Sequence, residues 1–278
     1  MDIWQSISIG PAPRLWVDSM GDGELVVLLH GIGGNRRNWH PNLPAFAESL
    51  HAVAWDARGY GDSDDYDGAL DFHDFARDLA RVLDHFGARR AHILGLSMGS
   101  WIAMDFAATW PDRLATLTLC ATHTGYAQFS EAAKAQFVQS RKAPLVAGAE
   151  PADIAAPVAR TLVSPKAPAE ALEQLVDSMA RLHKWSYIKA IEAIVHTDNR
   201  ETLPRIAVPT HVICGADDGL TTPDMAREVA GLVPGAELTI IPAAGHLVNI
   251  ERPAAFNAAA LSFLQRHLGT ASVAAPAT

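Results

Sequence analysis

The stretch GLSMGS, Gly95 to Ser100, is the most informative local signal in this chain. It places Ser97 between two glycines, directly after the apolar run Ala91 to Leu96 and directly before a helix expected from Met98 to Thr109. A nucleophilic serine must stand on a strained turn with its hydroxyl exposed, and flanking glycines let the strand and the helix approach closely. In this strand-turn-helix context, Ser97 is predicted to be a nucleophile rather than part of a Gly/Ser turn without chemical meaning.

Apolar runs of strand length alternate with helix-period segments on both sides of this stretch. Such alternation predicts βαβ units and a mostly parallel sheet flanked by helices, which is an α/β fold. The expected strands are 25–29, 52–55, 91–96, 114–120, 210–214 and 237–241, and the expected helices are 39–50, 72–86, 98–109, one capped by Thr222 with Pro223 first, and 253–268.

The alternation is interrupted in the middle of the chain. From about residue 122 to 203 the strand signals stop, and the sequence becomes Ala-rich and helical with several proline breaks. We therefore predict a core domain formed by residues 1–121 and 204–268, with a helical insertion at 122–203. The last segment, GTASVAAPAT at 269–278, is rich in small residues and is expected to be disordered.

Composition excludes several classes of protein. The formal net charge of -9 argues against a nucleic-acid partner. The two cysteines, Cys120 and Cys214, lie in apolar runs typical of buried free thiols, which indicates a reducing compartment. The first residues, MDIWQSISIG, lack a signal-peptide pattern, and the apolar segment 91–110 is better explained as a strand and a helix than as a membrane span. We expect a cytoplasmic protein without membrane contact, and a homo-oligomer is compatible with the sequence.

The motif HGIGG, His30 to Gly34, follows the expected strand 25–29 and has two interpretations. The backbone N–H groups of Ile32 and Met98 could form a pair of donors for a developing oxyanion. Alternatively, the glycines begin a dinucleotide-binding G-x-G-x-x-G motif, with Asp56 placed to meet a ribose. The third glycine position is Arg36, whose side chain would obstruct helix packing beside a pyrophosphate, so the first interpretation is favoured.

A histidine and an acid follow the last two expected strands. His246 lies in AGHLVNIE, and the run GADDGL offers the adjacent acids Asp217 and Asp218. Residues that follow parallel strands share one edge of the sheet, so Ser97, one of these acids and His246 should converge in the chain order Ser, Asp, His. Adjacent residues project to different sides, so only one acid can reach the imidazole. His123 follows strand 114–120 and shares the same edge.

Acidic residues after DARGYGDS, Asp56 to Ser63, raise the question of a metal site. Ser63, Asp65 and Asp67 match the first half of a calcium loop, but the sequence lacks the helix that should precede it. No His/Cys cluster has zinc spacing. A solvated acidic loop without metal is the preferred interpretation.

The motifs HGIGG, DARGYGDS, GLSMGS, GADDGLTTP and GHLVNIERPAAF together resemble the α/β-hydrolase superfamily over about residues 14–268. The resemblance implies a mostly parallel central sheet, a helical cap at 122–203 and a Ser-His-Asp triad that needs no cofactor. The superfamily's pattern places the triad acid three residues after the glycine of GADDGL, at Asp218. Within the superfamily, the chain most resembles 3-oxoadipate enol-lactonases and small carboxylesterases.

This resemblance implies a serine hydrolase that cleaves a small-molecule ester or lactone through an acyl-enzyme. A carbon-carbon bond hydrolase of ring-fission products is an alternative, although such enzymes usually carry Asn and Trp where this chain has Leu96 and Leu247. A ligand receptor without turnover is a third. Candidate pocket residues are His123, Phe129, Phe137, Trp185 and Tyr187, and candidate cations for a substrate carboxylate are Arg36, Arg37, Arg141, Lys142 and Lys184.

Overall fold

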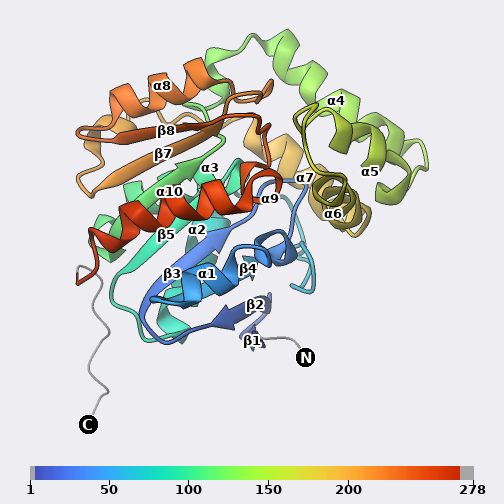
Figure 1. Ribbon diagram of the computed structural model, residues 1–278. Helices are drawn as coiled ribbons and strands as arrows, with labels where there is room; N and C mark the ends of the chain where they lie inside the picture. Colours follow the sequence, from blue (N-terminus) through green and yellow to red (C-terminus); the bar gives the residue numbers. More distant parts are fainter. Residues whose placement is uncertain (1–3, 270–278) are drawn as a thin grey trace.

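Within residues 4–269, which the computed structural model describes, the chain forms one eight-stranded sheet in the order β1-β2-β4-β3-β5-β6-β7-β8 (Figure 1). Strands β1 and β2 are antiparallel to their neighbours, and all pairs from β4 to β8 are parallel. The strands are β1 Gln5–Ile9, β2 Leu15–Met20, β3 Glu24–Leu29, β4 Leu50–Asp56, β5 Ala91–Leu96, β6 Leu114–Cys120, β7 Thr210–Gly215 and β8 Glu237–Ile241.

Helices cover both faces of this sheet: α1 and α10 lie on one face, and α2 and α3 lie on the other (Figure 1). Every residue of β5 and β6 is buried, as expected for parallel strands covered on both faces. This architecture confirms the predicted mostly parallel sheet flanked by helices. The helices are α1 Leu43–Ala47, α2 His73–His85, α3 Met98–Thr109, α4 Glu131–Val146, α5 Pro151–Arg160, α6 Ala169–Ala180, α7 Lys184–Ile194, α8 Pro223–Leu232, α9 Val248–Glu251 and α10 Pro253–Gln265, with short 3-10 helices η1 Arg36–Trp39, η2 Pro111–Arg113, η3 Tyr126–Gln128 and η4 Leu203–Arg205.

Helices α4 to α7 connect β6 to β7 and form a separate layer beside one end of the sheet (Figure 1). We call these four helices, together with the segments that join them, the cap. They pack as the pairs α5 with α6 and α4 with α7. Contacts with the loop after β4 anchor α7, because Ser186 Oγ donates to Asp65 Oδ1 at 2.5 Å and Lys189 Nζ donates to Tyr66 O at 2.9 Å. The cap therefore rests on the edge of the sheet where the parallel strands end.

The predicted helix 39–50 is wrong. The chain forms η1, then α1, and enters β4 at Leu50. In a helix 39–50 Pro44 would be the sixth residue, where its missing N–H group would leave a carbonyl without a partner, whereas in α1 it lies in the first turn, where no N–H donor is required. The sequence pattern also failed to identify β1 and β2. The predicted disordered tail, 269–278, lies outside the described residues except for Gly269.

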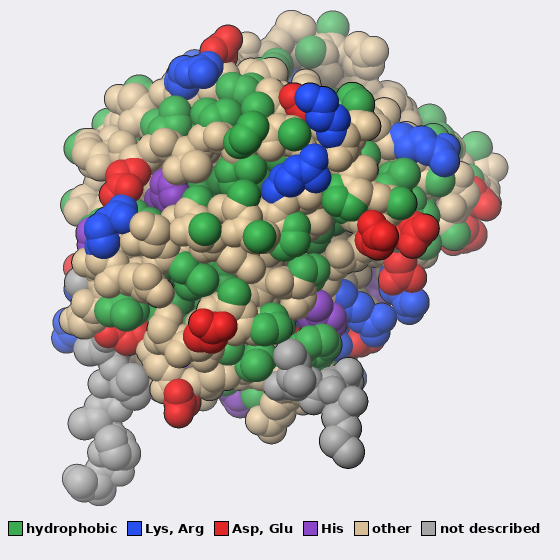
Figure 2. All heavy atoms as spheres, in the orientation of Figure 1, with side chains coloured by type: hydrophobic (Ala, Val, Ile, Leu, Met, Phe, Trp, Pro, Cys, Tyr) green, Lys and Arg blue, Asp and Glu red, His purple; other side chains and the backbone are tan. Residues whose placement is uncertain are grey.

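No helix within residues 4–269 is both long enough and apolar enough to cross a bilayer. Acidic, basic and apolar side chains are interspersed on the face drawn in Figure 2. Cys120 and Cys214 are buried free thiols.

Candidate active site

Ser97 stands on a strained turn between β5 and α3. Its φ of 55° and ψ of -115° lie in a region that residues other than glycine rarely adopt. Its N–H donates to Cys120 O of β6 at 2.8 Å, which holds the turn against the neighbouring strand. Ser100 strengthens this link, because its buried hydroxyl lies 2.7 Å from Gly95 O and accepts a hydrogen bond from Cys120 N at 3.0 Å. The turn is thus fixed from both sides.

The two glycines of the GLSMGS motif are explained by close backbone contacts. A Cβ atom on Gly95 would lie 2.2 Å from Gly99 O, and a Cβ atom on Gly99 would lie 2.3 Å from Leu29 O. Both distances are too short for any side chain. The motif therefore lets α3 start directly against β3 and β5, and its position presents the Ser97 side chain beyond the end of β5.

The two predicted oxyanion donors are the chain neighbour of Ser97, Met98, and a residue of the same cavity, Ile32. Met98 is the first residue of α3, where a helix provides no acceptor for the N–H group. Ile32 follows β3 and lines the same cavity as Ser97. Gly31 permits this approach, because a Cβ atom there would lie only 3.2 Å from Ser97 Cβ. His30 holds the loop: its Nδ1 donates to Gly31 O at 2.8 Å, and its Nε2 accepts from Ala57 N at 3.1 Å.

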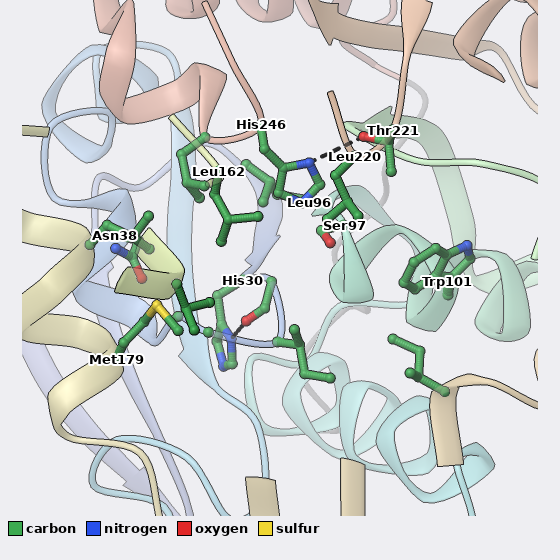
Figure 3. Close-up of a pocket in the computed structure, with 18 of the residues that line it drawn as sticks. His30, Asn38, Leu96, Ser97, Trp101, Leu162, Met179, Leu220, Thr221 and His246 are labelled. Carbon is green, nitrogen blue, oxygen red and sulfur yellow. Dashed lines mark hydrogen bonds between the residues drawn. The ribbon is translucent and has the colours of Figure 1, made fainter. Parts of the chain in front are cut away.

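The predicted acid and base meet at the ends of β7 and β8. His246 Nδ1 lies 2.9 Å from Asp218 Oδ2, and both side chains are buried. Because an ionised carboxylate only accepts hydrogen bonds, Nδ1 carries the proton and Nε2 is left to accept one. Ser97 and His246 lie next to each other in the cavity (Figure 3). Within residues 4–269 the His246 ring is hydrogen-bonded to Asp218 and Thr221 but not to Ser97, and such contacts often tighten only when substrate binds.

Asp218 is surrounded by hydrogen-bond donors. Its Oδ1 accepts from Leu220 N and Thr221 N, each at 2.9 Å, and its Oδ2 accepts from Thr221 Oγ1 at 2.6 Å. Burial acts to raise the pKa of Asp218, but the charge that His246 carries when protonated, its hydrogen bond and the bonds from Thr221 together outweigh burial and hold the pKa below its usual value. The carboxylate therefore stays ionised beside the imidazole.

Asp217 faces the cap instead of the imidazole. Its Oδ2 accepts a hydrogen bond from Ser164 Oγ at 2.7 Å, and its backbone N–H donates to Ala244 O at 2.8 Å. Ser164 belongs to the segment between α5 and α6 of the cap. The two adjacent acids thus have different partners, one at the candidate catalytic histidine and one at the cap.

Glu251, which the sequence pattern did not identify, holds the loop that carries His246. This carboxylate is 1 % exposed and accepts three backbone N–H groups: Gly245 N and Ser164 N on Oε2, each at 2.9 Å, and Leu247 N on Oε1 at 3.1 Å. In addition, His246 N donates to Leu162 O of the cap at 2.8 Å. The histidine loop and the cap segment 162–164 are therefore joined through one buried side chain.

We expect Glu251→Gln to destabilise the protein and to lower its turnover. The amide nitrogen of glutamine cannot accept a hydrogen bond, so at least one buried N–H group beside His246 would lose its partner, at a cost of about 1 to 3 kcal/mol. Urea unfolding and kcat should be measured together, with the exposed Glu48→Gln as the matched control. Unchanged stability and unchanged kcat would show that this carboxylate does not position the loop.

A mostly apolar cavity lies between the sheet edge and the cap (Figure 3). Ser97, His246 and Ile32 line its core side, and cap side chains line the other. Such a cavity, apolar with a few convergent polar groups, is typical of a small-molecule site. The cap side chains that line it are Phe137, Arg141, Val158, Leu162, Leu175, Met179, Tyr187 and Ile194.

The structure corrects two of the predicted pocket residues. Trp185 is 63 % exposed and does not line the cavity; Tyr187, two positions further along α7, is buried and does. Residues two positions apart on a helix point in nearly opposite directions, so only one of the pair can face inward. Phe129 does not line the cavity either, but packs with ring centroids 5.3 Å from His123 and 5.6 Å from Tyr126, which both do.

His123 is a neutral side chain in the cavity wall. Its Nδ1 accepts from Gly125 N at 3.1 Å, so the proton sits on Nε2. Burial lowers the pKa of His123 to about 4, and the nearby charge of His246 acts in the same direction. A neutral N–H donor of this kind can orient a substrate without adding charge to the site.

We expect the free energy of unfolding to decrease as the pH falls from about 6.5 to 4. Burial lowers the pKa values of His30, His123 and His211 to about 4 from the ordinary 6.5. Between these values the unfolded chain binds more protons than the folded one, so acid favours unfolding by up to about 1.4 kcal/mol per pKa unit and histidine. Urea unfolding between pH 7.5 and 4.5 measures this slope.

A matched pair of variants isolates the histidine contribution to this slope. His211→Gln should make it shallower, whereas His85→Gln, at an exposed position, should leave it unchanged. Equal slopes for wild type and His211→Gln would contradict the assignment.

The contacts of Asp56 and Asp65 do not favour the dinucleotide-binding and calcium-binding interpretations of the sequence. Asp56 forms an ion pair with Arg36 and so is not free to meet a ribose. Asp65 Oδ1 is hydrogen-bonded to His183 and Ser186, so this oxygen is not free to act as the calcium ligand that the loop pattern suggested. Among the side chains that the structure describes, no group of three or more His, Cys, Asp or Glu residues is arranged to hold a metal ion.

Comparisons with known proteins identify the family of this fold. Residues 24–253 match the family model of the alpha/beta hydrolase fold. The chain is 31% identical over 272 residues to a 2-hydroxy-6-oxononadienedioate/2-hydroxy-6-oxononatrienedioate hydrolase of Burkholderia vietnamiensis, covering 92% of this chain and 93% of that relative. It is 27% identical over 250 residues to 3-oxoadipate enol-lactonase 2 of Acinetobacter baylyi, covering 88% and 90%.

Solved structures show the same likeness. A thermophilic esterase from Thermogutta terrifontis superposes with a TM-score of 0.86 at 26% identity, over 95% of this chain and 99% of the esterase. An enol-lactonase from Burkholderia xenovorans superposes with a TM-score of 0.83 at 25% identity, over 94% and 100%. The family match and the relatives confirm the resemblance that the sequence motifs carry: this chain belongs to the alpha/beta hydrolase fold family.

Proposed function

We propose that this hydrolase-family protein is a serine hydrolase that cleaves a carboxylic ester or a lactone through an acyl-enzyme. The observation that carries the proposal is the convergence of Ser97, on its strained turn, with a buried His246–Asp218 pair in one cavity. This combination of nucleophile, base and orienting acid is recognised by geometry on many folds. The esterase and enol-lactonase relatives support the substrate class.

All catalytic groups of the proposed reaction belong to the chain, and water is the second substrate. His246 Nε2 takes the proton of Ser97 Oγ as the serine attacks the carbonyl carbon, and the backbone N–H groups of Ile32 and Met98 stabilise the oxyanion. The imidazolium then gives its proton to the leaving oxygen, which leaves an acyl group on Ser97. Water, deprotonated by His246, then attacks the acyl carbon, and the imidazolium returns that proton to Ser97 Oγ as the acyl–oxygen bond breaks and the acid is released. Asp218 keeps the proton on Nδ1 and stabilises the imidazolium, and each oxyanion donor contributes about 2.7 to 4 kcal/mol.

A second candidate is the hydrolysis of a carbon-carbon bond. The relative from Burkholderia vietnamiensis is named for an oxo-dienedioate, a compound with no ester or lactone in its name, and it is 31% identical to this chain. The same serine, histidine and acid could serve that reaction.

A substrate panel tests the proposal and separates the two candidates. It contains short p-nitrophenyl esters, simple lactones and ring-fission dienes, and it measures product release over many turnovers. Repeated turnover of esters or lactones supports the proposal, and turnover of the dienes alone supports the second candidate. Binding of these compounds without product release would contradict both and would favour a receptor.

A further inference from the structure

Arg141 places a positive charge in the cap side of an otherwise apolar cavity wall. It lies on α4, is partly buried, and lines the cavity together with Phe137 and Tyr187. Of the five cations that the sequence offered for a substrate carboxylate, Arg141 is the one that lines this cavity. A cation in such surroundings is costly unless something compensates it.

The other four candidate cations are engaged or exposed. Arg36 pairs with Asp18, Asp56 and Asp62. Lys142 pairs with Glu192, Lys184 pairs with Glu150, and Arg37 is exposed. Their charges are therefore neutralised by the protein or solvated by water.

Arg141 is oriented by neutral groups only. Its Nη1 donates to Phe137 O at 3.1 Å and lies 3.4 Å from Ser140 Oγ, and its guanidinium carbon lies 3.9 Å from the centroid of the Phe137 ring. Within residues 4–269, no carboxylate lies within ion-pair distance of it. The guanidinium is thus held in place while its charge stays without a counter-ion.

Two buried tyrosine hydroxyls interact electrostatically with the Arg141 guanidinium. Burial raises the pKa values of Tyr126 and Tyr187, and the positive charge of Arg141 acts against that increase at both. Both tyrosines line the cavity. Arg141, Tyr126 and Tyr187 therefore form a polar group in the cavity wall.

We infer that Arg141 binds a carboxylate that belongs to the substrate. The planar guanidinium suits a carboxylate, with which it can form two parallel hydrogen bonds, and the tyrosine hydroxyls can donate to the same group. The inference rests on the proposed function and narrows its substrate class. The substrate is an ester or lactone that also carries a free carboxylate, separated from the reacting carbonyl by an apolar segment that fills the space between core and cap.

Paired substrates test this inference. Mono-p-nitrophenyl suberate carries a terminal carboxylate, and its terminal primary amide has nearly the same shape without the charge. The shorter pimelate pair varies the distance between the two ends. We expect the wild type to prefer the carboxylate member by about 10- to 100-fold in kcat/KM, the range for hydrogen bonds to a charged group. Arg141→Gln should bring the ratio of the two values close to one.

Two further variants make the result specific to this side chain. Arg141→Lys keeps the charge but loses the two-pronged geometry, so its ratio should be intermediate. Arg160→Gln, at an exposed position on α5 of the same cap, should keep the wild-type ratio. A wild-type ratio near one, or an unchanged ratio in Arg141→Gln, would overturn the inference.

The failure of the inference can be told apart from the failure of the proposed function. If the wild type hydrolyses both esters equally, the proposed function stands and the carboxylate site is wrong. If neither ester is turned over, calorimetric binding of suberate decides: binding that weakens at least tenfold in Arg141→Gln supports the site while contradicting the hydrolase function. Absence of such binding contradicts both.

Discussion

Ser97→Ala is expected to abolish ester hydrolysis and leave the fold intact. Without the hydroxyl no acyl-enzyme can form, and loss of a catalytic serine typically lowers kcat by about 10⁴- to 10⁶-fold. The fold should tolerate the change, because Ala has the same Cβ atom at the strained φ of 55° and the Ser97 hydroxyl makes no hydrogen bond within residues 4–269. Steady-state turnover of the best ester in the panel, together with the thermal unfolding midpoint, measures both expectations.

Covalent labelling provides the control for this variant. A fluorophosphonate probe should label the wild type at Ser97 and fail to label Ser97→Ala. The exposed serine of α10, changed in Ser262→Ala, should affect neither labelling nor turnover. Retained hydrolysis by Ser97→Ala would contradict the proposed mechanism as a whole.

Asp218→Asn is expected to lower kcat by about 10³- to 10⁴-fold, whereas Asp217→Asn should change it less than tenfold. The backbone N–H groups of Leu220 and Thr221 would hold the carbonyl of Asn in place of Oδ1 and turn its NH2 group toward His246 Nδ1. This favours the tautomer with the proton on Nε2, which then cannot act as a base. At position 217 the carboxylate contacts Ser164 of the cap, so Asn there should alter cap contacts and KM more than kcat. Steady-state kinetics on both variants compares adjacent residues of identical chemistry.

The pH dependence of kcat adds a second readout for this pair. Contacts with His246 and Thr221 hold the pKa of Asp218 below its usual value, so this side chain stays ionised in mild acid. Protonation of Asp218 should therefore not lower the kcat of the wild type in that pH range. A larger loss of kcat in Asp217→Asn than in Asp218→Asn would reverse the assignment of the acid.

Local sequence signals predicted the centre of the fold well. The expected strands 91–96 and 114–120 and the expected helix 98–109 have the bounds of β5, β6 and α3. Strands β5 and β6 are fully buried and α3 is buried over most of its length, so their apolar runs are long and their ends are marked by glycine, proline or polar residues. For these three elements the local apolar pattern alone was enough to predict both the type of element and its bounds.

At the edge of the sheet the local signals were insufficient. Strands β1 and β2 pair antiparallel at one side, and much of β1 is exposed, so its sequence QSISI has little apolar content. The prolines near 41 and 44 were outweighed by an apolar helical period, which led to the incorrect helix 39–50. Strands β1 and β2 are stabilised by pairing with each other and with β4, and the sequence near a strand does not show which distant strand it will pair with.

By itself, the sequence determined that a serine, an acid and a histidine meet at one edge of the sheet, because each follows a parallel strand and the carboxyl ends of such strands coincide. The superfamily's pattern favoured Asp218, but only the tertiary structure showed that Asp218 and not Asp217 contacts His246. It also excluded Trp185 from the cavity wall while retaining Tyr187, and it placed Arg141, alone of the five candidate cations, in that wall. The physical reason is common to all three. The direction of a side chain, and whether its charge is neutralised, depend on contacts between the core and the cap, whose residues lie far apart in the chain.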